Sequence, residues 1–178
     1  MANRKLGGPI PFLLGLAAAL ALGWGIYPHI IYSKQEQPVQ FSHQVHMDQG
    51  LDCESCHSYR NDGSYAGTPS LEDCTMCHNE VLSGLPHEEK FVEEYVQEEK
   101  QVPWKVYQKQ PDNVYFSHIA HQDYECTECH QDLENAESLP SLSKNLLTGY
   151  TQQTMKMKDC ESCHADHQAS NACYVCHK

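Results

Sequence analysis

The chain has 178 residues, with 24 acidic and 12 basic side chains and a formal net charge of −12 at pH 7. So acidic a chain excludes nucleic acid as a plausible partner, because carboxylates and phosphates repel one another. Of its residues 40% are hydrophobic, and a good share of these lie in one N-terminal stretch. The remainder is too polar for a self-sufficient core and requires cross-links or a cofactor.

The N-terminal stretch predicts a membrane segment. Arg4 and Lys5 precede an uncharged run at residues 6–33. Within it, Ala19-Leu20-Ala21 fits a signal-peptide cleavage site, but the run also has the roughly 20 apolar residues that span a bilayer, and we favour this retained anchor. Basic residues before the helix predict a cytoplasmic N-terminus. We therefore expect a single-pass protein of the inner (cytoplasmic) membrane, with everything after the anchor in the periplasm.

Five Cys-x-x-Cys-His motifs account for all ten cysteines. They comprise Cys53, Cys56 and His57; Cys74, Cys77 and His78; Cys126, Cys129 and His130; Cys160, Cys163 and His164; and Cys173, Cys176 and His177. Two thiols at this spacing add to the two vinyl groups of one haem, and the adjoining His becomes the proximal iron ligand. Disulfides and zinc, the competing explanations, require no His after every pair. The motifs therefore predict five covalent haem c groups.

A repeated pattern predicts the ligands on the other face of the irons. Phe41-Ser42-His43-Gln44-Val45-His46 precedes the first motif, and Phe116-Ser117-His118-Ile119-Ala120-His121 precedes the third. Histidines at positions i and i+3 lie on one side of a helical turn and can reach two different haems. We therefore predict His43, His46, His118 and His121 as distal ligands.

Other side chains are further candidates for iron ligation. His167 lies three residues after a proximal histidine, too close to reach the same iron from the opposite face, so it would serve a neighbouring haem; His87 is the other candidate. Met155 or Met157 could ligate one haem instead, which would raise its potential. We interpret His29, at the end of the anchor, as an interfacial residue; a role as an iron ligand or at a quinone site is the alternative. Twelve histidines also suffice for six bis-histidine haems, so a sixth, non-covalently held haem stays open.

The haem density predicts the architecture. After the anchor 146 residues serve five motifs, about one haem per 29 residues, so the haems should form the core and short helices and loops should wrap them, with little regular structure. We expect an anchor helix at 1–33, a di-haem unit at 34–86, an acidic amphipathic helix and linker at 87–113, and a tri-haem unit at 114–178.

The acidic segment has its own pattern. Phe91, Val92, Tyr95 and Val96 follow a helical period, six glutamates flank them, and Pro103 should end the helix. The glutamates are Glu88, Glu89, Glu93, Glu94, Glu98 and Glu99. We interpret the segment as a helix with a solvated acidic face; a docking patch is the alternative.

The two sets of motifs together resemble a known family. The paired Phe-Ser-His-x-x-His and Cys-x-x-Cys-His units of residues 41–78 and 116–178 resemble the class III cytochromes, the cytochrome c3 and c7 group. The resemblance implies a multihaem class III cytochrome c-like fold. It also implies that His43 ligates the haem of the first motif and His118 that of the third, whereas His46 and His121 reach other haems.

A narrower resemblance concerns the whole chain. The chain is similar to the multihaem cytochrome subunits of two respiratory complexes, the quinone reductase complex of sulfate reducers and alternative complex III. The similarity lies in the anchor followed by Gln40–His46, and in Trp104–Tyr107 followed by Val114–His118. Those complexes contain polytopic quinone-binding membrane subunits and an iron–sulfur/molybdopterin-like subunit. In the first, electrons flow from periplasmic cytochrome c3 to menaquinone; in the second, they flow from menaquinol to a soluble acceptor. Residues 33–178 carry 24 acidic and 10 basic side chains, net −14, which favours a soluble basic cytochrome c3 as partner.

We therefore predict an electron-transfer subunit of a respiratory complex, not an enzyme by itself. Histidines are available for both faces of the irons, and a six-coordinate iron cannot bind substrate. A multihaem nitrite or sulfite reductase would need an open iron and usually an altered motif. A self-contained quinol dehydrogenase of the NapC/NrfH type is a further alternative. In that type the first motif follows the helix closely, whereas here 20 residues separate Tyr32 from Cys53.

Overall fold

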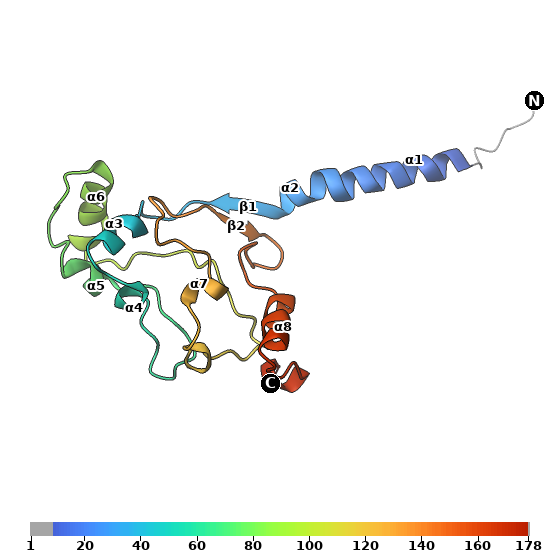
Figure 1. The fold of residues 1–178 in the computed structure, drawn as a ribbon. Helices are drawn as coiled ribbons and strands as arrows, with labels where there is room; N and C mark the ends of the chain where they lie inside the picture. Colours follow the sequence, from blue (N-terminus) through green and yellow to red (C-terminus); the bar gives the residue numbers. More distant parts are fainter. Residues whose placement is uncertain (1–8, 178) are drawn as a thin grey trace, which may run out of the picture.

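The computed structural model describes residues 9–177 and shows a long N-terminal helix attached to a small domain (Figure 1). The helix consists of α1 (Pro9–Leu20), η1 (Ala21–Ile26) and α2 (Tyr27–Ile31). Together they form 23 residues, of which an 18-residue stretch has a mean hydropathy of 1.8, long and apolar enough to cross a membrane. Arg4 and Lys5, on which the predicted orientation rests, lie outside the described residues.

A two-stranded antiparallel sheet joins the anchor to the domain. Strand β1 (Tyr32–Gln35) follows the anchor directly and pairs with β2 (Leu142–Asn145), with Tyr32 opposite Asn145. After β2, the Leu146 N–H donates to the carbonyl of Ile31, the last residue of the anchor helix (2.7 Å). These backbone bonds fix the domain at the point where the helix ends.

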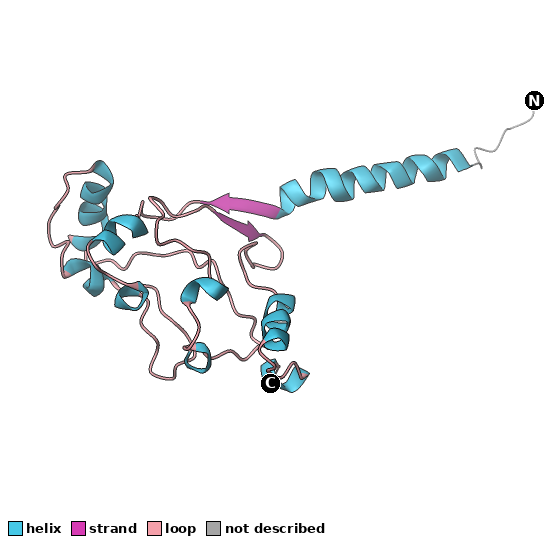
Figure 2. Ribbon diagram, viewed as in Figure 1, coloured by secondary structure: helices cyan, strands magenta, loops and turns pink. Residues whose placement is uncertain are grey.

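The rest of the domain consists of short helices joined by loops (Figure 2), as predicted for a multihaem cytochrome. The helices are α3 (His43–Asp48), α4 (Cys53–Cys56), α5 (Leu71–Thr75), α6 (Pro86–Phe91), η2 (Val92–Val96), η3 (Ile119–His121), α7 (Cys126–Cys129), α8 (Met157–Asp166) and α9 (Cys173–Cys176). Helices α4, α7 and α9 each begin at the first cysteine of a motif. A single turn is enough to set both thiols of a motif on one side.

The predicted acidic helix divides into α6 and a wider turn, η2. Phe91 and Val92 are buried and form a small hydrophobic cluster with Leu71 of α5 and with Val102. The cluster packs the acidic segment over the helix that carries the second motif. Most of the glutamates are exposed, but Glu88 is buried.

The polypeptide alone encloses little. Its accessible surface is 13480 Å², whereas a compact monomer of 20.2 kDa would expose about 8,800 Å². Part of the excess is the exposed anchor helix. The rest reflects a domain whose loops enclose space that side chains do not fill.

Candidate haem sites

Imidazole rings face one another in pairs across gaps that suit a metal ion. The pairs are His46 with His78 (6.1 Å between ring centroids), His118 with His130 (6.2 Å) and His121 with His164 (6.2 Å). Two imidazoles that bind one ion from opposite sides, each at about 2.0 Å, place their centroids about 6 Å apart. Each pair joins a predicted distal histidine to a predicted proximal one.

His43 lies beside the histidine of the first motif. Burial lowers the pKa of His43, and the neighbouring His57 and His46 lower it further. The neutral imidazole, which is the form that binds metals, is therefore favoured. Burial and the neighbouring His118 and His57 likewise lower the pKa of His130.

The two Phe-Ser-His-x-x-His turns are held in matching ways. Ser42 Oγ (3.4 Å) and Gln44 N (3.2 Å) donate to the carbonyl of Ala136, six residues after His130. In the second turn, Ser117 Oγ (3.4 Å) and Ile119 N (3.2 Å) donate to the carbonyl of Gly63, six residues after His57. The turn before the first motif is therefore bound to the loop after the third motif, and the turn before the third motif is bound to the loop after the first. This exchange gives the domain a local pseudo-two-fold arrangement.

The phenylalanine of each turn orients its two histidines. Phe41 stacks on His46 (4.4 Å between centroids) and meets His43 edge-on (5.0 Å). Phe116 stacks on His121 (4.7 Å) and meets His118 edge-on (4.9 Å). The repeated Phe thus sets the two imidazoles of each turn at an angle to one another, so that the two rings would serve different irons.

Gly63 is required by this arrangement, and its replacement by alanine should destabilise the domain. Its φ is +67°, and an added Cβ would lie 2.3 Å from Cδ1 of Ile119, within the turn that carries His118. We expect Gly63→Ala to lower the free energy of unfolding by about 1–3 kcal/mol, from left-handed strain and overpacking, measured by thermal unfolding. Gly67→Ala is the control, because the nearest atom to its Cβ would be Ser58 O at 3.7 Å. An equal loss in both variants would contradict this account.

In most of these histidines one ring nitrogen, Nδ1, is hydrogen-bonded to the protein. In six of them, Nδ1–H donates to a backbone carbonyl: His46 to Ser42 (2.7 Å), His57 to Gly67 (2.8 Å), His118 to Ser64 (3.0 Å), His121 to Ser117 (2.9 Å), His164 to Ser170 (3.0 Å) and His177 to Asn113 (3.2 Å). Such partners fix the tautomer and orientation of a metal-binding histidine. They leave Nε2 free to bind an iron.

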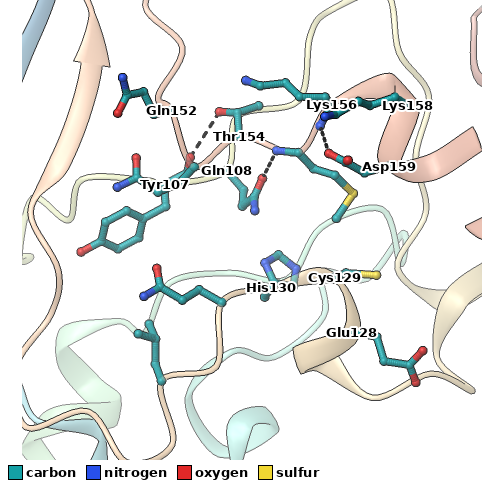
Figure 3. A pocket seen from close by; sticks show the side chains of 14 residues that line it. Tyr107, Gln108, Glu128, Cys129, His130, Gln152, Thr154, Lys156, Lys158 and Asp159 are labelled. Carbon is teal, nitrogen blue, oxygen red and sulfur yellow. Dashed lines mark hydrogen bonds between the residues drawn. The ribbon is translucent and has the colours of Figure 1, made fainter. Parts of the chain in front are cut away.

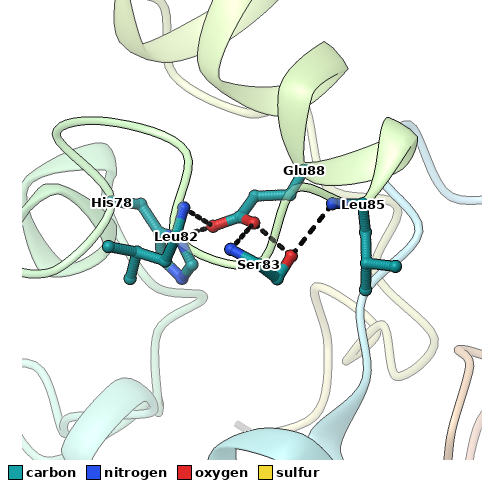
Figure 4. Close-up of polar contacts among 5 residues, drawn as sticks. All are labelled: His78, Leu82, Ser83, Leu85 and Glu88. Carbon is teal, nitrogen blue, oxygen red and sulfur yellow. Dashed lines mark hydrogen bonds and ion pairs between the residues drawn. The ribbon is translucent and has the colours of Figure 1, made fainter.

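His78 differs, because its partner is a carboxylate. Nδ1 of His78 lies 2.8 Å from Oε1 of Glu88, a residue only 7% exposed. The same carboxylate accepts bonds from the backbone N–H groups of Leu82 (3.0 Å) and Ser83 (2.7 Å) and from the Ser83 hydroxyl (Figure 4). The sequence placed Glu88 on a solvated acidic face, and nothing in the local pattern separates it from Glu89. Glu88 contacts His78 only because the loop between the second motif and α6 folds back and places the two side chains together.

Thiols of different motifs lie close together. Burial raises the pKa of several thiols, and a thiol of another motif raises it further: Cys126 for Cys53, Cys56 for Cys74, Cys163 for Cys129 and Cys176 for Cys160. The attachment sites therefore form a connected series.

Unpaired polar atoms and a cavity mark space for a large group. Among residues 9–177, His43 Nδ1, Trp104 Nε1 and Gln153 Oε1 are buried without a hydrogen-bonding partner. A cavity of about 560 Å³ opens beside Cys129 and His130 (Figure 3), within the size range of cofactor sites. Paired thiols, paired imidazoles and this space together fit a covalently attached haem.

The first and fifth motifs lack such a ring pair. Within the described chain, neither His57 nor His177 has a ring contact with another imidazole, although His57 is near enough to His43 to lower its pKa. His167 packs against Tyr124 (5.0 Å, near perpendicular), and His87 has no ring contact in the described part. Met155 places its sulfur 3.6 Å from Cys160 Sγ. Iron ligation by each of the predicted histidines, His87 and His167 included, stays a prediction.

Comparisons with known proteins agree with this geometry. Residues 28–101 match the class III cytochrome c family, and residues 114–178 match cytochrome c7 and related cytochromes c. The fold and sites thus define a multihaem cytochrome with covalently bound haem c. The chain is 48% identical over 191 residues to the menaquinone reductase multihaem cytochrome c subunit of Nitratidesulfovibrio vulgaris (strain Hildenborough), covering 97% of this chain and 91% of that protein. It belongs to this family of electron-transfer subunits, and both predicted resemblances are confirmed.

Proposed function

We propose that this chain is a membrane-anchored, periplasmic pentahaem cytochrome c that passes electrons between a soluble redox partner and a menaquinone-reactive membrane complex. The pairing of distal and proximal imidazoles carries the proposal, because an iron held by two histidines exchanges electrons but offers substrate no position. The quinone side rests on the relative, which is named as a subunit of menaquinone reductase.

The connected motifs support a linear order of haems. His43 and His46 on one turn link the first and second haems, and His118 and His121 link the third and fourth. Cys53 and Cys126 approach one another between the first and third motifs, and Cys160 and Cys176 between the fourth and fifth. The resulting order is second, first, third, fourth, fifth. Helices α5 and α6, by the second motif, lie at the end of the domain far from the anchor, whereas α8 lies on the anchor side (Figure 1).

The far end is suited to a basic soluble partner such as cytochrome c3. Glu89, Glu93, Glu94 and Glu98 are exposed there, above the second motif. We expect the association rate constant with a basic cytochrome to fall at least about tenfold between about 0.01 M and 1 M salt, because screening shortens the range of electrostatic attraction. Stopped-flow kinetics would measure it. A rate constant independent of salt would count against this docking end.

Three further measurements test the proposal as a whole. Intact mass, which counts only covalently bound haem, and the pyridine haemochrome assay should both give five haems per chain; a sixth haem in the haemochrome assay alone would show the additional, non-covalent haem. The purified chain should not oxidise menaquinol by itself but should do so, or run the reverse reaction, within its complex. Quinol oxidation by the isolated chain would favour the NapC/NrfH type. The direction of flow in the reconstituted complex separates a menaquinone reductase from an alternative complex III subunit.

A further inference from the structure

The part of the domain nearest the anchor has a charge unlike the rest. Residues 138–158 contain no Asp or Glu, although the chain has 24. They contain three lysines, Lys144, Lys156 and Lys158, and all three are exposed. The next carboxylate along the chain, Asp159, accepts a bond from the backbone N–H of Lys156 (2.9 Å). A basic segment of this length stands out in a domain of net charge −14.

The same segment exposes apolar side chains. Leu146 is 61% exposed, Leu147 75% and Met157 60%. The turn that carries the leucines is well defined, because Asn145 Oδ1 accepts from the N–H groups of Leu147 (2.9 Å) and Thr148 (3.0 Å). The turn that exposes the two leucines is therefore held by local hydrogen bonds.

The position of these side chains relative to the membrane is fixed by the anchor. Leu146 N bonds to the carbonyl of Ile31, where the membrane helix ends. Lys156 and Met157 line a cavity of about 410 Å³ together with Tyr32, the first residue after that helix. Figure 1 shows the loop after β2 and the start of α8 on the side from which the anchor leaves. Both groups thus lie at the level where the helix would leave the bilayer.

We propose that this anchor-side surface rests on the lipid surface of the membrane. It consists of Lys144, Leu146, Leu147, Lys156, Met157 and Lys158. Leucine and methionine side chains enter the boundary between headgroups and acyl chains, as in interfacial segments. The lysines lie against the phosphates of anionic lipids, which attract basic residues close to a membrane. The contact holds α8 and the fourth haem motif close to the membrane, where a quinone-reactive partner works.

Thiol labelling can test the proposal, since all ten native cysteines lie in haem motifs. An introduced cysteine is then the sole free thiol of the haem-loaded chain. Leu146→Cys is compared with Leu82→Cys, at the far end of the domain, because both leucines are 61% exposed. The full chain is placed in nanodiscs containing phosphatidylglycerol, without other subunits, and treated with a charged, membrane-impermeant maleimide. We expect Leu146→Cys to react at least about tenfold more slowly.

Three outcomes decide the matter. Equal rates would overturn the proposal, and so would protection that arises only in the assembled complex, because another subunit would then cover the surface. Replacing Lys144, Lys156 and Lys158 together by glutamine should reduce the protection in anionic nanodiscs. Unchanged protection in that variant would overturn the assignment of the lysines to the headgroups.

Discussion

Glu88→Gln is expected to raise the reduction potential of the haem at the second motif by about 60 mV or more, a tenfold shift in a one-electron equilibrium. A carboxylate at Nδ1 makes the imidazole of His78 more electron-donating, which stabilises ferric iron. Burial would raise the pKa of Glu88, but hydrogen bonds from Ser83, Leu82 and His78 outweigh it and lower the pKa to about 2, so the charge is present at neutral pH. Glutamine keeps the shape and removes the charge. A potentiometric titration followed by electron paramagnetic resonance would measure the shift.

Glu89→Gln is the matched control. It removes the same charge from the next residue of α6, but Glu89 is exposed and its charge is screened by solvent. We expect a much smaller shift in this variant, with five haems retained in both. Equal shifts would mean that the net charge of the helix, not the bond to His78, sets the potential.

The bond between His78 and Glu88 distinguishes the second motif from the other motifs. At six other histidines the Nδ1 partner is a neutral carbonyl group, whereas at the second motif it is a charged carboxylate. The second haem should therefore be the lowest in potential, at the end of the proposed series far from the membrane. Electrons entering there from a soluble donor would move towards higher potential as they approach the membrane, the direction that menaquinone reduction requires.

The sequence alone was sufficient to predict those features that depend on residues close together in the chain. A Cys-x-x-Cys-His motif sets two thiols and an imidazole within five residues, so its chemistry is readable without the fold. The Phe-Ser-His-x-x-His turns are equally local, and the structure brings His46, His118 and His121 to the proximal histidines at metal-binding spacing. The short helices were expected from the same reasoning, since haems and not side chains were predicted to form the core.

The remaining features depend on segments far apart in the chain. The pairing of β1 with β2 joins residues about 110 positions apart, and the sequence of neither strand indicates which segment it pairs with. Gly63 and Ile119 meet only because the two turns exchange loops. In Leu-Pro-His87-Glu88, the histidine was the candidate by residue type, but the glutamate is the residue that contacts a proximal imidazole. Residue type alone could not distinguish them, because the closing loop at Leu82 and Ser83 determines which side chain faces inward.

His121→Ala should open one iron. The His121 ring faces His164 at 6.2 Å and nearly parallel (11°), so its loss leaves the haem of the fourth motif with one protein ligand. We expect a high-spin signal and about one additional carbon monoxide bound per chain, relative to the unsubstituted protein. Optical titration of the reduced protein with carbon monoxide would count the open irons, and the haem assay should still give the full number.

His167→Ala is the comparison that gives this result its meaning. His167 lies only three residues from His164, but its ring packs against Tyr124 and not against an imidazole. If it is not a ligand, its removal adds no carbon monoxide site, and the two variants differ by about one equivalent. A gain of one site in His167→Ala would instead assign His167 to a neighbouring iron, with the fifth haem as the natural candidate because His177 has no imidazole opposite it in the described chain. No gain in His121→Ala would contradict the pairing with His164, and with it the proposed link between the third and fourth haems.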